Sequence, residues 1–178
     1  YDENNVYGIG DADKQILGHK NPDWSLGFQN TFTWKDFDLS IYMYARFGQM
    51  IKYDLLTAYD NKGVGNFPEY FDYWTSTNPS NDFAALDSSY DIKQTKGYSG
   101  RAFVDGSFFK IKNITLGYTM PTAICNKLQL QKLRIYGTIT NPLVVAKRHL
   151  LKDYDPERGG DLDFPLTKQL VFGLNLTF

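Results

Sequence analysis

The C-terminal stretch of the chain, residues 169–178, alternates strictly between two kinds of side chain. One set is entirely Leu and Phe, and the other is mostly small or polar. Because successive side chains of a β-strand point to opposite faces, this pattern predicts a strand with one apolar face. A strand between lipid and a wet lumen has this pattern, and an aromatic last residue suits the membrane–water interface. The apolar set is Leu170, Phe172, Leu174, Leu176 and Phe178.

Four further stretches repeat the pattern. Only Lys35 and Asp36 separate the first two, and paired positions of such a hairpin share a face, so the apolar positions change from even to odd across the turn, as observed. A strand of about 11 residues is about 36 Å long and covers about 25 Å when tilted near 45°, the height of an outer-membrane apolar band. The sequence therefore predicts an all-β fold of antiparallel transmembrane strands, at about 24–34, 37–47, 109–120, 132–140 and 169–178.

The connections alternate in length. The 34–37 turn and the 121–131 link are short, whereas residues 48–107 and 141–168 are long links, and residues 1–23 precede the first strand. Outer-membrane barrels have short periplasmic turns and long extracellular loops, so we expect the three long segments to be extracellular. A short helix is expected near 49–59.

Composition excludes several other functions. The 178 residues carry a net charge of −1, which gives no electrostatic basis for nucleic-acid binding. The single Cys125 forbids an internal disulfide, and the chain has no nucleophile elbow, phosphate loop or metal triad. We therefore expect neither an enzyme nor a cofactor. Because the chain begins at Tyr1 without a signal peptide, we expect a mature or truncated piece.

Several motifs together resemble the C-terminal part of SusC/RagA-type TonB-dependent outer-membrane transporters. They occur in the family's order and extend over nearly all of the chain. They are ILGHKNPDW at 16–24, FDLSIYMYARFG at 37–48, YWTSTNP at 73–79, DGSFFKIKNITLGYTMP at 105–121, YDPE at 154–157 and the terminal strand.

The resemblance implies a 22-stranded β-barrel in the bacterial outer membrane, of which residues 1–178 supply about the last five strands. The plug domain and TonB box would lie in an absent N-terminal part. The implied function is energy-coupled import, with an oligosaccharide as the expected cargo and a peptide as the alternative. The implied partners are a SusD-like surface lipoprotein, TonB and outer-membrane lipid. A soluble β-sandwich carbohydrate-binding module is the alternative from another class; it would need charged residues opposite the apolar face.

Three groups of side chains are candidate functional residues. Loop aromatics would contact sugar or the lipoprotein lid, or else pack the loop against itself: these are Tyr70, Phe71, Tyr73 and Trp74. Residues expected to face the lumen would line a substrate path, or else contact the plug: these are Tyr42, Tyr44, Arg46, Arg134 and Tyr136. An acidic run has the oxygen ligands that Ca²⁺ prefers, although Arg158 stands where an EF-hand needs Gly, and a solvated loop is the favoured alternative: its members are Asp153, Asp155, Glu157, Asp161 and Asp163.

Overall fold

The computed structural model describes residues 11–53, 72–81, 83, 85, 98–148, 151, 154–159 and 166–178. The chain divides into two compact units, one within residues 1–19 and 50–104 and the other within residues 20–49 and 105–178.

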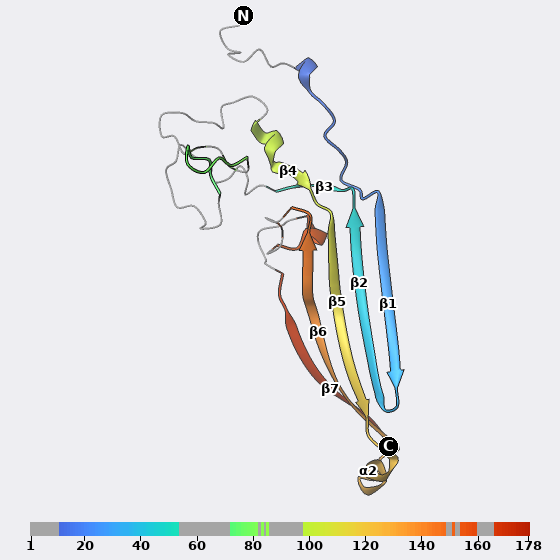
Figure 1. The fold of residues 1–178 in the computed structure, drawn as a ribbon. Helices are drawn as coiled ribbons and strands as arrows, with labels where there is room; N and C mark the ends of the chain where they lie inside the picture. Colours follow the sequence, from blue (N-terminus) through green and yellow to red (C-terminus); the bar gives the residue numbers. More distant parts are fainter. Residues whose placement is uncertain are drawn as a thin grey trace, which may run out of the picture. The chain divides into compact units, whose positions relative to one another are not determined.

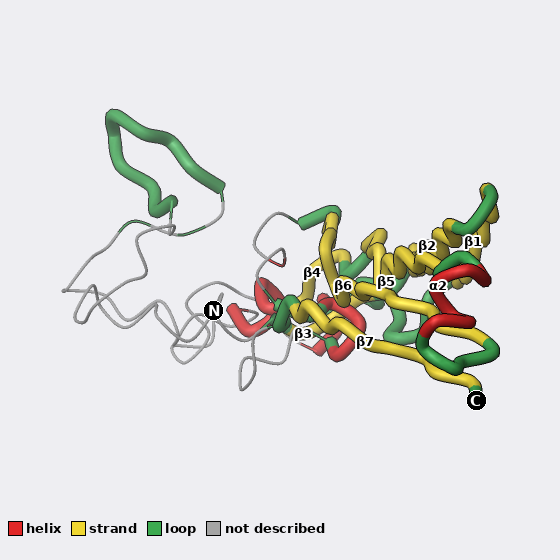
Figure 2. Tube along the Cα trace, turned by 90° about the horizontal axis from the view of Figure 1, so that it is seen from below, coloured by secondary structure: helices red, strands yellow, loops and turns green. Residues whose placement is uncertain are grey.

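The second unit is built on a five-stranded antiparallel sheet (Figure 1). The strand order is β1-β2-β5-β6-β7, so the strands follow one another up and down, and β1 and β7 form the two edges. Figure 2, a view from the end that carries the β1–β2 turn, shows the five strands as one layer. The antiparallel all-β expectation is thereby confirmed. The strands are β1 (Trp24–Trp34), β2 (Phe37–Phe47), β5 (Phe108–Thr119), β6 (Lys132–Ala146) and β7 (Gln169–Thr177).

The β1–β2 hairpin has the register that the sequence pattern predicts. Trp34 pairs with Phe37, and the pairing continues without a shift to Trp24 and Phe47. Lys35 has a φ of 55°, the left-handed conformation that the first central residue of a primed hairpin turn requires. The turn, the helix α2 (Thr122–Lys127) and the C-terminus lie at the same end of the sheet, which we call the turn end (Figure 1).

A β-bulge changes the phase of β5. Tyr42 pairs with Asn113, but the next residue of β2, Met43, pairs with Ile111, so that Lys112 is an extra residue in its strand. Ile111 therefore shares a face with Ile114 although their numbers differ in parity. On both sides of the bulge most apolar residues of β5 lie on one face, and the bulge turns Lys112 toward the other. Phe108, which pairs with Arg46, also lies on that other face.

Strand β6, which lies beside this bulge, is longer than the sequence pattern predicts. We expected the strand to end at about Thr140. Instead β6 continues to Ala146, and Asn141 and Pro142 lie opposite Lys112, between the Thr140–Asn113 and Leu143–Ile111 pairs. Proline lacks an N–H donor for the ladder but is tolerated at a bulge, and Asn141 has the positive φ of 53° that asparagine accepts more readily than most residues.

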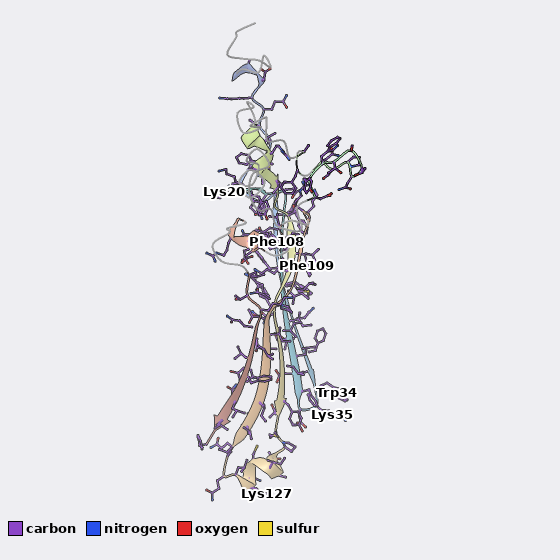
Figure 3. All side chains as sticks on the ribbon, turned by 90° about the vertical axis from the view of Figure 1, so that its left-hand side faces the viewer. Lys20, Trp34, Lys35, Phe108, Phe109 and Lys127 are labelled. Carbon is purple, nitrogen blue, oxygen red and sulfur yellow. The ribbon has the colours of Figure 1, made fainter. Side chains whose placement is uncertain are left out.

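One face of the sheet is apolar and exposed. Phe172 is 76% exposed, Trp24 73% and Leu174 62%. The opposite face is mainly polar; its contacts include a 2.9 Å hydrogen bond between the hydroxyls of Thr115 and Thr138. Figure 3 shows side chains projecting from both faces, with Trp34, Lys35 and Lys127 at the turn end and Phe108 and Phe109 toward the other, which we call the loop end.

The first unit has little regular structure among its described residues. A short sheet pairs β3 (Met50–Lys52) with β4 (Phe103–Asp105), where we expected the start of a helix; residues 54–59 lie outside the described part. Tyr53, fully buried, donates its backbone N–H to the carbonyl of Ala102 at 2.6 Å. The 3-10 helices are η1 (Asp11–Asp13) and η3 (Tyr98–Ala102). None of the helices among the described residues has the length and apolar composition needed to cross a membrane.

Candidate functional site

The five side chains expected to face a lumen lie on the polar face of the sheet. Tyr42, Tyr44 and Arg46 alternate along β2 toward the loop end, and Arg134 and Tyr136 alternate along β6 near the turn end. The structure therefore brings these residues onto one face but separates them into two groups.

The turn-end group is organised by an ion pair across three strands. Arg134 on β6 donates from Nε to Oδ1 of Asp38 on β2 at 2.8 Å, and a second bond joins Nη2 to Oδ2. The pair passes over Gly117 of the intervening β5: a Cβ there would lie 2.4 Å from Arg134 and 2.5 Å from Asp38. A side chain at position 117 would therefore displace the two charged groups from this arrangement.

The ring of Tyr136 lies against the polar face of the sheet, over Gly173. It pairs with Gly173 of β7, and a Cβ on Gly173 would lie 2.3 Å from the Tyr136 ring. The Arg134 guanidinium carbon lies 5.0 Å from the centroid of the same ring. A ring seated on glycine backbone and covered by a guanidinium is a fixed part of the wall, which favours a structural role for Tyr136.

The loop-end group is a cationic cluster around Tyr44, formed by Arg46, Lys110 and Lys112. Arg46 donates from Nε to the Tyr44 hydroxyl at 2.8 Å. The guanidinium carbon of Arg46 lies 5.4 Å from the Tyr44 ring centroid, and Nζ of Lys112 lies 4.9 Å from it. Lys110 pairs with Tyr44 across the two strands. Cations near an aromatic ring are attracted by its quadrupole, so Tyr44 helps to hold this cluster together.

Two carboxylates of the YDPE motif bind the lysines of the cluster. Nζ of Lys110 lies 2.9 Å from Asp155 and 3.1 Å from Glu157, and Nζ of Lys112 lies 2.7 Å from Glu157. Lys110 is only 2% exposed, and removing one partner of a buried ion pair generally costs about 3–5 kcal/mol. Burial raises the pKa of Glu157, but the hydrogen bonds from Lys112 and Lys110 outweigh burial and hold that pKa below its usual value.

The two carboxylates are presented by a short, well-defined turn. The Asp155 side chain accepts a 3.2 Å hydrogen bond from the backbone N–H of Glu157 at the start of η5 (Pro156–Arg158). Gly159 ends η5 in the left-handed conformation, with a φ of 82°. Pro156 and Leu151 are fully buried. We call residues 154–159 the DPE turn; its two ion-paired carboxylates fasten it to β5.

The acidic run is therefore only partly available as a calcium site. Asp155 and Glu157 are bound by lysines, and the described residues contain no group of three or more metal-ligating side chains. Asp153, Asp161 and Asp163 lie outside the described residues, so calcium binding there stays a prediction.

The DGS motif at 105–107 ties strand ends together. The hydroxyl of Ser107 accepts from the backbone N–H of Gly48 at 3.0 Å, and Asp105 accepts from the Ser107 N–H at 2.9 Å. Gln49 is buried and exchanges hydrogen bonds with Gly106. Burial raises the pKa of Asp105, but hydrogen bonds from Lys147 and Ser107 lower it further, to below the usual value. The motif thus fixes the loop end of the sheet.

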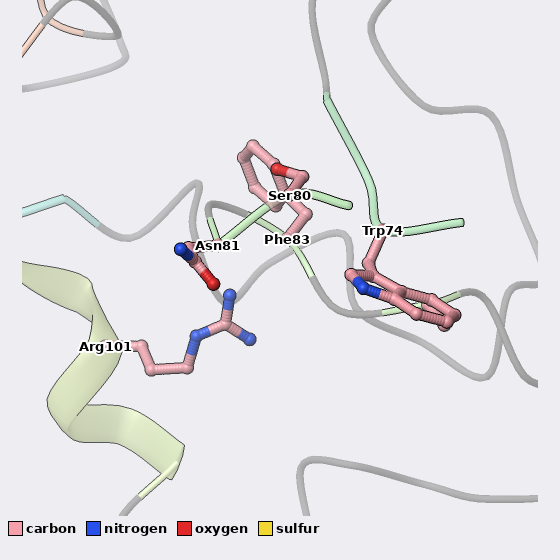
Figure 4. Close-up of a pocket in the computed structure, with 6 residues that line it drawn as sticks. Trp74, Ser80, Asn81, Phe83 and Arg101 are labelled. Carbon is pink, nitrogen blue, oxygen red and sulfur yellow. The ribbon is translucent and has the colours of Figure 1, made fainter. Parts of the chain in front are cut away.

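The loop aromatics are partly described. Tyr73 is 39% exposed and Trp74 is 44% exposed, while Tyr70 and Phe71 lie outside the described residues. The backbone N–H of Trp74 donates a hydrogen bond to the backbone carbonyl of Phe83 at 3.0 Å. A cavity of about 390 Å³ opens beside Trp74 (Figure 4), and its walls are Trp74, Ser80, Asn81, Phe83, Ala85 and Arg101. The indole is positioned by backbone pairing yet remains nearly half exposed, as a contact residue would be.

Sequence reasoning did not identify Lys110, Lys112 or Asp38 as site residues. Regular alternation would give Lys110 and Lys112 the apolar face of Ile114, and only the bulge places them on the polar face. The ion pairs themselves join residues 45 to 96 positions apart, and nothing in the local pattern specifies such partners.

No family model matches the chain. Among curated proteins, TonB-dependent receptor P26 of Formosa agariphila is 30% identical over 196 residues, covering 100% of this chain and 19% of that protein. TonB-dependent receptor P3 of the same organism is 27% identical and covers 96% of this chain and 18% of that protein. The chain therefore spans about a fifth of the length of these relatives.

Solved structures of similar fold include one described as the RagAB peptide transporter. It matches with a TM-score of 0.68 and 26% identity, covering 93% of this chain and 18% of that chain. The RagAB peptide importer in the closed-closed state matches with a TM-score of 0.70 and 24% identity over 92% of this chain and 18% of that chain. The resemblance seen in the motifs is confirmed: the chain is similar to TonB-dependent receptors over nearly its whole length.

Proposed function

We propose that the chain forms part of the wall of a TonB-dependent importer in the bacterial outer membrane. The observation that carries this proposal is the five-stranded sheet with an exposed apolar face and a mainly polar opposite face. Such a sheet is stable in a bilayer when the apolar face meets lipid and the polar face a wet lumen. The edge strands β1 and β7 would pair with strands outside this chain and so close the barrel.

Aromatic residues support an orientation. Trp34, Phe37 and Tyr118 lie in one row at the turn end, with 4.6 Å between the ring centroids of Phe37 and Tyr118. Aromatic girdles mark membrane–water interfaces, and short turns are periplasmic in outer-membrane barrels. The turn end is therefore assigned to the periplasm, and the long segments 1–23, 48–107 and 147–168 to the outside.

Adjacent residues of β1 test the wall assignment. Phe28 and Gln29 lie on opposite faces of the sheet. The experiment replaces each of them separately by cysteine in the full-length protein and labels the cysteines in intact cells. A water-soluble maleimide should label Gln29→Cys, whereas Phe28→Cys should react only with a lipid-soluble reagent. Equal labelling of both by the water-soluble reagent, or purification without detergent, would favour the soluble sandwich instead.

The loops are proposed to contact a SusD-like surface lipoprotein. The similar solved structures are RagAB assemblies, and Tyr73 and Trp74 offer exposed aromatic surface of the kind that anchors interfaces. Replacing both by Ala should reduce recovery of the lipoprotein in pull-downs without lowering barrel abundance. If the two aromatics only hold the loop together, limited proteolysis of intact cells will show faster cleavage while lipoprotein recovery is unchanged.

An oligosaccharide is the proposed cargo. The half-exposed indole of Trp74 beside the polar Ser80 and Asn81 is the combination of stacking surface and hydrogen-bonding groups that binds sugar rings. A peptide is the second candidate, because similar solved structures are described as a peptide importer. Uptake of defined oligosaccharides and oligopeptides by cells with and without the full-length gene separates the two.

A further inference from the structure

We propose that Arg46 and Lys112 form a carboxylate-binding site on the polar face of the sheet. In this site the chain's own Glu157 binds Lys112, whereas Arg46 is open to cargo. The inference rests on the proposed function, because it requires cargo to pass this face. It deepens that function by naming acidic oligomers as the cargo that the wall recognises.

The first argument is the balance of charge. Three cations, Arg46, Lys110 and Lys112, meet two carboxylates. Both carboxylates bind the lysines. Within the described part of the chain, the only hydrogen bond of Arg46 goes to the neutral hydroxyl of Tyr44. One positive charge of the cluster is thus without a counterion there.

The second argument is the orientation of the arginine. Its Nε–H is held by Tyr44, which leaves both terminal nitrogens of the guanidinium for another acceptor. That edge is a planar pair of donors which matches the two oxygens of a carboxylate. Arg46 is half-buried, so the guanidinium is accessible while its direction is fixed.

The third argument is the bulge that places Lys112. In a regular strand Lys112 would share the apolar face with Ile114; the bulge instead brings its ammonium to 4.9 Å from the Tyr44 ring. Bulges are common beside functional sites, where they redirect a side chain. The redirected lysine and Arg46 thus both contact the Tyr44 ring, and an anion stabilises two cations gathered at one side chain.

Glu157 shows what kind of group fits. Its carboxylate binds Lys112 at 2.7 Å, and the two side chains are 22% and 28% exposed, whereas Lys110 is 2% exposed. A carboxylate of the cargo would therefore reach Arg46 and Lys112 but not Lys110. Glu157 of the DPE turn would therefore compete with a cargo carboxylate for Lys112.

The test is calorimetric titration of the detergent-solubilised full-length protein with triglutamate and with trigalacturonate, each against its neutral match, triglutamine and galactotriose. At least one acidic oligomer should bind more tightly than its match, and the one that does identifies the source as peptide or sugar. Arg46→Gln should weaken that binding about tenfold, the loss expected for a charge-assisted hydrogen bond. Lys127→Gln, an identical charge change on α2, should have no effect. Glu157→Gln should strengthen binding severalfold by freeing Lys112, a gain that misfolding would not produce.

Two results would overturn the site: acidic and neutral oligomers that bind alike or not at all, or acidic binding that is unchanged in both Arg46→Gln and Glu157→Gln. Whole-cell uptake assays distinguish failure of the carboxylate site from failure of the proposed import function. If cells import a neutral oligomer through the wild-type protein, the importer holds and only the carboxylate site fails. If no oligomer is imported, the proposed function fails with it.

Discussion

Leu170 and Val171 provide a matched test of which face meets lipid. They are adjacent in β7, similar in size, and 60% and 48% exposed on opposite faces of the sheet. Leu170 lies in the row of Ile41, Ile114 and Ile139 on the apolar face, near the middle of the strands. On the proposed orientation, Leu170→Arg places a charge in lipid near the bilayer midplane, whereas Val171→Arg places it in the lumen.

The register also predicts how the penalty depends on depth. Leu174 lies four residues nearer the turn end, in the row of Phe37 and Tyr118. Four residues extend about 14 Å along a strand, or about 10 Å along the membrane normal at a 45° tilt, close to half of a 25 Å apolar band. Arginine should therefore cost about 2–4 kcal/mol at Leu170 but only about 0–1 kcal/mol at Leu174.

Equilibrium refolding of the full-length barrel into lipid vesicles, titrated with denaturant, measures these costs. The expected order of destabilisation is Leu170→Arg above both Leu174→Arg and Val171→Arg. Equal costs at Leu170 and Val171 would refute the assignment of the faces, and equal costs at Leu170 and Leu174 would refute the assignment of depth.

Four further predictions follow from the contacts. Gly117→Ala should cost about 1–2 kcal/mol in the same assay by separating the half-exposed Asp38–Arg134 pair, with Gly137→Ala, which meets no atom closer than 3.4 Å, as the control. Lys110→Met should leave two carboxylates without their buried partner and release the DPE turn, seen as new protease cleavage near 154–159; a turn that stays protected would contradict its attachment through Lys110. Because the pKa of Glu157 is lowered from 4.5, its stabilising effect is complete above that value and is lost as the pH falls through the lowered pKa, so hydrogen exchange of the turn should accelerate only in that acidic range. Deletion of the exposed Phe178 should reduce surface abundance of the full-length barrel but not uptake per folded molecule; normal abundance would exclude a role in assembly.

The strand pattern was predictable because its cause is local. Alternation over about ten residues is visible in any window of the sequence, and β1 and β2 have the bounds that the alternation and the Lys35-Asp36 turn indicate. The end of β6 was not predictable in this way. Asn141-Pro142 has the composition of a loop, and only the neighbouring strand, with its own extra residue, makes it part of a ladder.

For the candidate site, the sequence predicted only on which face of the sheet the residues lie. Alternation placed Tyr44 and Arg46 opposite the apolar residues, but it carried no information on their partners. Lys110 meets Asp155 across 45 residues of chain, and Arg134 meets Asp38 across 96. Such pairs depend on the register of non-adjacent segments, which a single sequence does not reveal.

Because β5 carries one extra residue, the effect of a deletion at the loop end of the sheet depends on which residue is removed. Deleting Lys112 alone would remove the bulge and leave Ile111 opposite Met43 and Lys110 opposite Tyr44, so both residues would keep their faces. Deleting Ile111 instead would place Lys112 opposite Met43, on the apolar face. Deletions of two adjacent residues should thus have different outcomes, because one keeps the apolar face intact and the other places a lysine in it. In a library of single-codon deletions, loss of Lys112 should therefore reduce the abundance of the folded barrel less than loss of Ile111.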